Sequence, residues 1–205
     1  MKKVGVLISG RGSNLQALLD AAAAGSLGGE VAAVVSNVEG AAGLERARRA
    51  AVPALVSDHR GRSREEHDAA VAGLLAGHGV DLVCLAGYMR LLSPVFLRAF
   101  PGRVLNVHPS LLPAFPGRDA QRQAWEHGVK VSGATVHVVD EGLDAGPILA
   151  QEAVPVLERD GPEELAARIL AAEHRIYPRA VRAMLEGRVR IEGRRLRIEG
   201  SDAGE

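Results

Sequence analysis

Short apolar runs alternate with helical stretches along most of this 205-residue chain, and this alternation restricts the fold more than any other feature. Strands that alternate with helices are typical of a largely parallel sheet covered by helices. We therefore predict one α/β domain with a Rossmann-like, mostly parallel central sheet flanked by helices. Strands are expected near residues 4–8, 31–35, 53–56, 81–86, 103–108, 131–139 and 148–156, and helices near 14–24, 42–51, 63–78, 94–99, 119–127 and 162–186.

The end of the chain contains a near-duplication, Arg190–Gly193 and Arg197–Gly200, across a short turn that contains glycine. We expect a small closing hairpin there, followed by a frayed end from Ser201 to Glu205. No linker rich in proline, glycine or serine divides the chain, so residues 1–205 are predicted to form a single domain.

Composition and charge exclude several classes of protein. The formal net charge is zero, with 25 basic and 25 acidic residues, which gives no reason to expect a nucleic-acid or anionic-membrane surface. No segment approaches the roughly 18 apolar residues of a membrane span.

Cys84, the only cysteine, lies in the apolar run 80–86, so we expect a buried thiol in a reducing cytosol. The seven histidines show no zinc spacing, which argues against a metal. We expect a cytoplasmic protein that binds small molecules, as a monomer or homodimer.

The run Val104–Pro113 places an amide and an imidazole at the end of one predicted strand. Side chains two apart on a strand share a face, so Asn106 and His108 project side by side. Open α/β sheets bind ligands at the carboxyl ends of their strands. An amide beside an imidazole suits acyl transfer, because one group can hold an oxyanion while the other moves a proton. The proline-punctuated segment 110–117 is apolar enough to wall a pocket.

The first strand leads into a glycine-rich turn, 9–15, and then into a predicted helix. Such a turn directs free backbone N–H groups at an anion, and Arg11 strengthens a phosphate interpretation. The turn lacks the glycine pattern of a dinucleotide site and the lysine of a nucleotide P-loop. A tight turn without a ligand is the structural alternative.

A second loop, 140–147, follows the predicted strand 131–139 and carries Asp140, Glu141 and Asp144. If that strand lies beside the Asn106 strand, one of these carboxylates can reach His108 and stabilise its imidazolium form. The residue pattern does not choose among the three. His137 alternates with Thr135 on the same strand; it could face the site, but we interpret it as structural.

These motifs together resemble the phosphoribosylglycinamide formyltransferase family of folate-dependent enzymes. The resemblance is carried by Val6–Gln16, Gly87–Arg90, Leu105–Pro113 and Glu173–Pro178, and it covers nearly the whole chain. It implies the formyltransferase fold and transfer of the formyl group of 10-formyltetrahydrofolate to the amine of 5-phosphoribosylglycinamide, in de novo purine biosynthesis. It also implies a phosphate-binding half (1–100), a catalytic and folate-binding half (101–188), and a hairpin with a tail (189–205).

The same resemblance assigns roles to individual residues. Asn106, His108 and Asp144 fall on the catalytic positions. Gly12, Ser13 and Asn14 fall on the loop that holds the substrate phosphate, and Glu173 matches a residue that contacts the glycinamide substrate. The positions that bind folate in the family are matched by eight residues of this chain: Arg64, Met89, Arg90, Leu91, Leu92, Asp140 and, in addition to their catalytic role, Asn106 and Asp144. Ala114 and the pair Arg118–Asp119 depart from the usual residues of the loop beside the motif.

Three other functions deserve comparison. Formyltetrahydrofolate deformylases look similar around the same three residues but usually have an extra N-terminal domain, for which a first strand beginning by Val4 leaves no room. Methionyl-tRNA formyltransferases usually add a C-terminal RNA-binding domain. A non-catalytic nucleotide-binding module would use the first loop only and would leave the Asn106–His108 pair unexplained.

Overall fold

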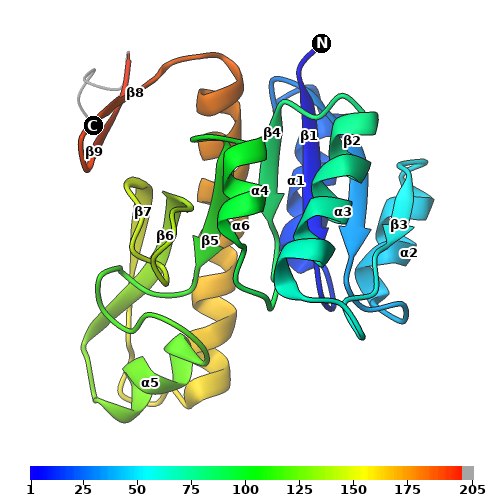
Figure 1. The fold of residues 1–205 in the computed structure, drawn as a ribbon. Helices are drawn as coiled ribbons and strands as arrows, with labels where there is room; N and C mark the ends of the chain where they lie inside the picture. The colour runs from blue at the N-terminus through cyan, green and yellow to red at the C-terminus, as the bar shows by residue number, and fades with distance from the viewer. Residues whose placement is uncertain (200–205) are drawn as a thin grey trace.

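The computed structural model describes residues 1–199, and it contains one nine-stranded sheet in the order β3-β2-β1-β4-β5-β6-β7-β9-β8 (Figure 1). The strands are β1 (Lys3–Ile8), β2 (Glu30–Ser36), β3 (Ala54–Val56), β4 (Leu82–Leu85), β5 (Val104–His108), β6 (Val131–Val138), β7 (Ile148–Pro155), β8 (Val189–Glu192) and β9 (Arg195–Ile198).

The first five strands are parallel, and two antiparallel strands continue the sheet beyond them. β1 pairs with β2 and β4, β2 with β3, and β4 with β5, all in parallel. β6 pairs antiparallel with β5 and with β7. The order in which successive strands are added reverses between β1 and β4, because β2 and β3 lie on one side of β1 while β4 and β5 lie on the other. Open α/β sheets form a ligand crevice at the carboxyl edge of such a point. That edge is the lower one in Figure 1, and the predicted mostly parallel α/β fold is confirmed.

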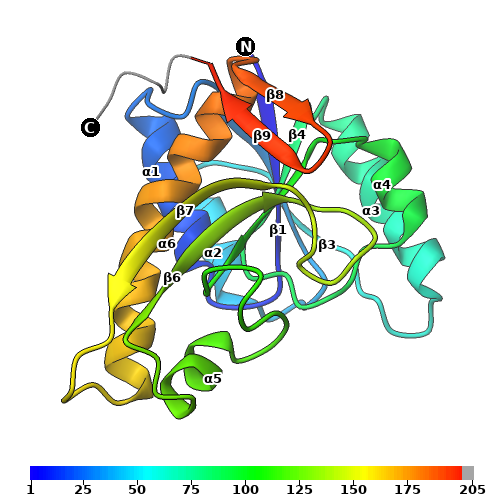
Figure 2. The ribbon, with the colours of Figure 1, turned by 90° about the vertical axis from the view of Figure 1, so that its left-hand side faces the viewer.

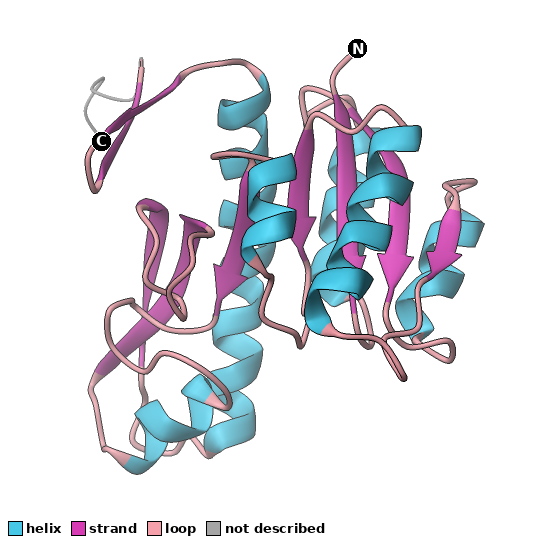
Figure 3. Ribbon diagram, viewed as in Figure 1, coloured by secondary structure: helices cyan, strands magenta, loops and turns pink. Residues whose placement is uncertain are grey.

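The described part of the chain has six helices, and all but the helix at 120–126, which lies beside the last helix beyond the lower edge of the sheet, cover one of its two faces (Figure 3). They are α1 (Ser13–Ala23), α2 (Ala42–Arg49), α3 (Arg64–Gly77), α4 (Pro94–Ala99), α5 (Ala120–Glu126) and α6 (Pro162–Leu185). Apolar side chains of α1, α2 and α6 pack with one face in the larger core cluster. Those of α3 and α4 pack with the other face in a second cluster. Among the described residues, no helix has the length and apolar character needed to cross a membrane.

Two side chains illustrate how the core is closed. Tyr177 of α6 is fully buried, and its hydroxyl donates to the carbonyls of Leu85 and Leu105, which ties α6 to β4 and β5. Cys84 on β4 is also fully buried, as the sequence predicts, and burial raises the pKa of its thiol to about 12. This thiol is therefore a packing residue and not a nucleophile.

The C-terminal hairpin is confirmed, with one difference in its boundaries. Its second strand begins at Arg195, two residues before the predicted start, because the turn consists only of Gly193, with φ of 62°, and Arg194. β9 also pairs with β7, so the hairpin extends the sheet (Figure 2). Gly200 and the tail Ser201–Glu205 lie outside the described residues.

Candidate active site

Four polar side chains share one face where β5 and β6 run side by side. Asn106 pairs with His137 and His108 pairs with Thr135 in the antiparallel register. Directly opposed residues project to the same face of a sheet. His108, Thr135 and His137 are buried, while Asn106 is half-buried. The predicted neighbourhood of the strands 103–108 and 131–139 is therefore confirmed, and the register adds His137 to the site.

The carboxylate of Asp144 completes this group, although its loop leaves the sheet at the far end of β5. β6 ends at Val138, which pairs with Leu105, so the following loop must fold back across the sheet to approach His108. Gly146 permits this path, since a Cβ there would lie only 1.8 Å from the Val138 carbonyl oxygen. Asp144 itself has a positive φ of 48°, a conformation that is uncommon for residues other than glycine, although aspartate tolerates it better than most.

Asp144 is the central acceptor of the site. Its Oδ2 lies 3.4 Å from Nδ1 of His108 and accepts a hydrogen bond of 2.8 Å from the Gly117 N–H. Its Oδ1 lies 3.5 Å from Nδ2 of Asn106 and 3.7 Å from Nε2 of His137. Among the three carboxylates that the sequence pattern leaves open, Asp144 is the one that the structure brings to His108.

The electrostatic surroundings keep Asp144 ionised. Burial by itself would raise the pKa of this carboxyl group. The His137 side chain, the Gly117 N–H and the nearby His108 ring outweigh burial and hold the pKa below its ordinary value of 3.8. Asp144 therefore carries a negative charge at neutral pH, next to the two imidazoles.

The imidazole of His108 is held in one orientation by the loop that follows β5. Its Nε2 is 2.8 Å from the carbonyl oxygen of Phe115, and because a carbonyl only accepts, Nε2 carries the hydrogen. Nδ1 is thereby turned toward Asp144. The loop is supported from β6, where the Thr135 hydroxyl donates to the Ser110 carbonyl. Residues 110–117 thus serve to orient the imidazole.

His137 is the residue whose position the sequence interpretation underestimates. Its Nε2 lies 3.2 Å from Nδ2 of Asn106, so it contacts the amide as well as Asp144. The alternation of Thr135 and His137 along the strand places His137 on the same face as Thr135. The antiparallel register with β5, which shows that this face is the site, appears only in the fold.

The turn after β1 has the geometry of an anion cradle at the start of α1. Gly12 precedes the helix with φ of 71°, and a Cβ there would lie 2.8 Å from Cα of Gly43 on α2. Only glycine satisfies both conditions. The first N–H groups of a helix have no partner within it, and they point out of its amino end. Arg11 is exposed beside this turn.

Asn14 connects that turn to α6. Its Nδ2 donates to Oε2 of Glu173 over 2.9 Å, although the two residues are 159 positions apart. Glu173 is 5% exposed, and burial raises the pKa of its carboxyl group to about 7, with the hydrogen bond from Asn14 as the opposing influence. The structure thus brings together two predicted substrate-binding residues.

The segment 86–92 between β4 and α4 lies at the same edge of the sheet and is held by Ser9. The Ser9 hydroxyl accepts the Met89 N–H over 2.8 Å and donates to Oδ1 of Asn37 over 2.6 Å. The side chains of Met89 and Leu91 are 62% and 56% exposed. Backbone and apolar side chains are therefore available there to a flat ligand.

Two further predicted residues do not reach the catalytic group. Arg64 lies exposed at the start of α3, and Asp140 is exposed and accepts the Gly142 N–H. Within the described chain, neither makes a hydrogen bond or ion pair with Asn106, His108 or Asp144.

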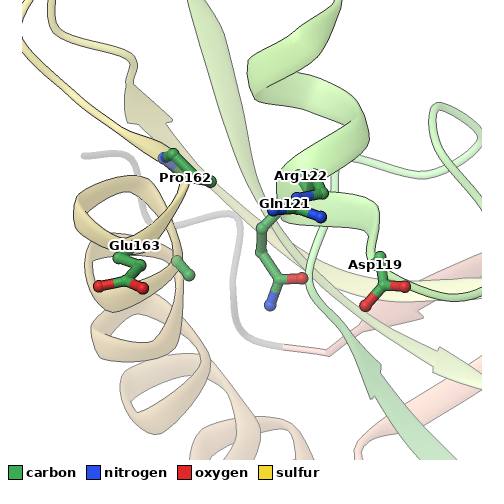
Figure 4. Close-up of a pocket in the computed structure, with 6 residues that line it drawn as sticks. Asp119, Gln121, Arg122, Pro162 and Glu163 are labelled. Atoms are coloured by element: carbon green, nitrogen blue, oxygen red, sulfur yellow. The ribbon is translucent and has the colours of Figure 1, made fainter.

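Other hollows of the surface do not coincide with this site. One hollow of about 230 Å³ lies between α5 and the start of α6 (Figure 4). None of the predicted site residues contributes to this hollow. Its lining residues are Asp119, Gln121, Arg122, Pro162, Glu163 and Ala166. In residues 1–199 no group of three or more histidine, cysteine or acidic side chains is arranged to hold a metal ion.

Comparison with known proteins identifies the class to which this fold and site belong. Residues 2–181 match the Formyl transferase family, and the chain belongs to that family. Within it, relatives of similar length are named phosphoribosylglycinamide formyltransferase. The protein of that name from Haemophilus influenzae is 41% identical over 201 residues, which cover 98% of this chain and 95% of the relative.

Solved structures and longer relatives agree with this placement. Glycinamide ribonucleotide transformylase 1 from Symbiobacterium toebii superposes with a TM-score of 0.95 at 62% identity, covering 97% of this chain and 94% of the other. A formyltetrahydrofolate deformylase from Pseudomonas syringae superposes with a TM-score of 0.90 at 33% identity, covering 96% and 65% of the two chains. The trifunctional purine biosynthetic protein adenosine-3 of Drosophila melanogaster is 50% identical over 189 residues, and the chain spans only 14% of its length.

Proposed function

We propose that this formyltransferase moves the formyl group of 10-formyltetrahydrofolate to the amine of 5-phosphoribosylglycinamide, a step of de novo purine biosynthesis. One observation carries the proposal. A carboxylate oxygen pair lies between an amide and an imidazole, with Asp144 Oδ1 3.5 Å from Asn106 Nδ2 and Oδ2 3.4 Å from His108 Nδ1. The donors that would stabilise a developing oxyanion are therefore already directed at negatively charged oxygen.

The reaction begins with attack by the unprotonated amine on the formyl carbon, which leaves negative charge on the former carbonyl oxygen. That oxygen takes a position near Asn106 Nδ2 and the protonated Nδ1 of His108, both of which donate to it. Preorganised donors of this kind each contribute about a hundred- to a thousandfold in rate. The bond from carbon to the substrate nitrogen forms, and the bond from carbon to N10 of the folate then breaks.

One proton must move from the attacking nitrogen to the departing folate nitrogen. His108 is the proton relay, because the Phe115 carbonyl holds its Nε2 and leaves Nδ1, on the side of Asp144, to exchange the proton. Asp144, ionised in this site, stabilises the imidazolium form of the ring. The products are tetrahydrofolate and the formylated amine, and no covalent enzyme intermediate or metal enters the scheme.

Two anchors would hold the substrates against each other. The phosphate lies on the turn Gly12–Asn14 at the start of α1, and Glu173 beside Asn14 meets the sugar and amide part of the same substrate. The pterin lies against the segment Met89–Leu92 and the loop from Asp140 to Asp144, with Arg64 nearby. Fixing two reactants in this way can supply roughly 7–11 kcal/mol of the barrier.

A direct test mixes the protein with 10-formyltetrahydrofolate and follows the folate absorbance with and without phosphoribosylglycinamide. Formyl release that requires the amine is the expected result, and His108→Ala is the matched inactive control. Release that does not depend on the amine would indicate a hydrolase, the activity named for the Pseudomonas syringae relative. No release under either condition would indicate a binding module.

A further inference from the structure

Polar atoms without hydrogen-bond partners gather around the segment 86–93, on the face of the sheet that α3 and α4 cover. Five buried side-chain atoms of this region form no hydrogen bond of good geometry within the described chain: His67 Nδ1, Asp68 Oδ1, Tyr88 OH, Arg90 Nε and Ser93 Oγ. Two pairs among them lie close to each other, since His67 is next to Asp68 and the Tyr88 hydroxyl interacts with the Arg90 side chain. Buried polar atoms are normally paired, so such a concentration requires an explanation.

His67 and Asp68, adjacent residues of α3, form the centre of this cluster. They are 0% and 1% exposed, and Nδ1 of His67 lies 3.5 Å from Oδ1 of Asp68. Nε2 of His67 is 2.8 Å from the Ser57 carbonyl, which fixes the ring. Burial, and then the charge of Asp68, raise the pKa of the Tyr88 phenol, while the Arg90 side chain opposes both effects. A buried acid and base at this site cost more than apolar residues of similar size would.

The side chain of Asp68 accepts a hydrogen bond from the backbone at the end of the segment. Its Oδ2 accepts the Ser93 N–H over 2.5 Å, where α4 begins. Ser9 holds the other part of the segment by accepting the Met89 N–H. Between these two anchors, the backbone N–H groups of residues 90–92 bond to no other residue of the described chain. The segment is thus anchored at Met89 and at Ser93, and within the described residues the N–H groups between these two points remain without a hydrogen bond.

We infer that Asp68, supported by His67, is a positioning residue that holds the segment 86–93 in the shape that receives the formyl donor. This inference rests on the proposed function, which places the pterin against Met89–Leu92. Within residues 1–199, Asp68 forms no hydrogen bond or ion pair with Asn106, His108 or Asp144. Its loss should therefore weaken the binding of the folate and leave the phosphate anchor at Gly12–Asn14 unchanged.

The test compares Asp68→Ala, Asp68→Asn and His67→Gln with a control, Asp81→Ala. Asp81 also accepts a backbone N–H, that of Lys3 over 2.9 Å, but at the opposite edge of the sheet. The measurements are KM for each substrate, kcat, and Kd for 5-formyltetrahydrofolate by calorimetry. We expect Asp68→Ala to raise Kd and the donor KM about tenfold or more, because small displacements of a binding segment are costly. KM for the amine substrate should stay within about twofold of the wild-type value, because its phosphate anchor at Gly12–Asn14 does not depend on Asp68.

The conservative variants make the inference falsifiable even if Asp68→Ala does not fold. Asp68→Asn keeps an acceptor for the Ser93 N–H and should restore most of the folate affinity. His67→Gln keeps a donor for the Ser57 carbonyl but leaves Asp68 without its basic neighbour, so it should weaken folate binding selectively. Asp81→Ala should lower stability without changing either KM.

Three outcomes have distinct meanings. Unchanged folate affinity in folded Asp68→Ala or His67→Gln, or equal weakening of both substrates, would overturn the positioning role alone. Wild-type protein that binds folate but transfers no formyl group would overturn the proposed function while the Kd comparison still decides the role of Asp68. Wild-type protein that binds no folate would overturn both.

Discussion

The substitution Glu173→Gln measures how much the buried carboxyl group of Glu173 lowers the free energy of unfolding when it is ionised. Glu173 is 5% exposed, and burial raises the pKa of its carboxyl group from 4.5 to about 7. The folded protein therefore holds this proton more tightly than the unfolded chain does. The stabilising effect is complete below about pH 4.5 and is lost as the pH rises through about 7.

The size of the effect follows from the same two values. A change in pKa from 4.5 to about 7 corresponds to about 3 kcal/mol of stability. Glutamine has a similar shape, remains neutral, and still offers an oxygen to Nδ2 of Asn14. The free energy of unfolding of the wild type, relative to Glu173→Gln, should therefore fall by about 3 kcal/mol between pH 4.5 and pH 8.

Urea denaturation of both proteins at several pH values in this range provides the assay, without any substrate present. The difference between the two unfolding free energies is the relevant quantity, because the other titrating groups cancel in it. Glu163→Gln, an exposed change on the same helix, is the control and should follow the wild type. A difference that is independent of pH, or that grows in favour of the wild type as the pH rises, would refute this reasoning.

The remaining predictions concern the catalytic residues and the phosphate turn. Asn106→Ala and His108→Ala should each lower kcat about a hundred- to a thousandfold, because each removes one oxyanion donor; near-native turnover in steady-state assays would contradict the assignment of that residue. Asp144→Asn should shift the acidic side of the pH–rate profile, since it removes the charge 3.4 Å from His108 Nδ1; an unchanged profile would point to another carboxylate. Gly12→Ala should destabilise the protein by about 1–3 kcal/mol in thermal unfolding, because φ at Gly12 is 71° and the new Cβ would lie 2.8 Å from Cα of Gly43. The same substitution should raise KM for the phosphorylated amine. Unchanged stability would show that the turn can adjust.

Local patterns account for much of the site. Asn106 and His108 are two apart on a strand, so any sheet would place them on the same face. The turn around Gly12 lies between a strand and a helix, and that order alone directs N–H groups outward. Neither conclusion depends on the rest of the molecule, and both agree with the geometry of β5 and α1.

Other parts of the site depend on distant segments. Asp144 reaches His108 only because the loop after β6 folds back across the sheet, which requires the close approach of Gly146 to Val138. His67 and Asp68 are helix residues of ordinary polar type, and nothing in their spacing indicates that both are buried.

The amino-acid pattern alone predicts the order of strands and helices, the placement of Asn106 and His108 on one face of a strand, and the glycine turn before a helix, because each depends on residues close together in the chain. The packing of distant segments brings Asp144 to the imidazole of His108, His137 to Asn106, and Asp68 to the Ser93 N–H. Those outcomes depend on strand register, loop path and burial. Such quantities arise when segments far apart in the sequence pack together, so no local pattern contains them.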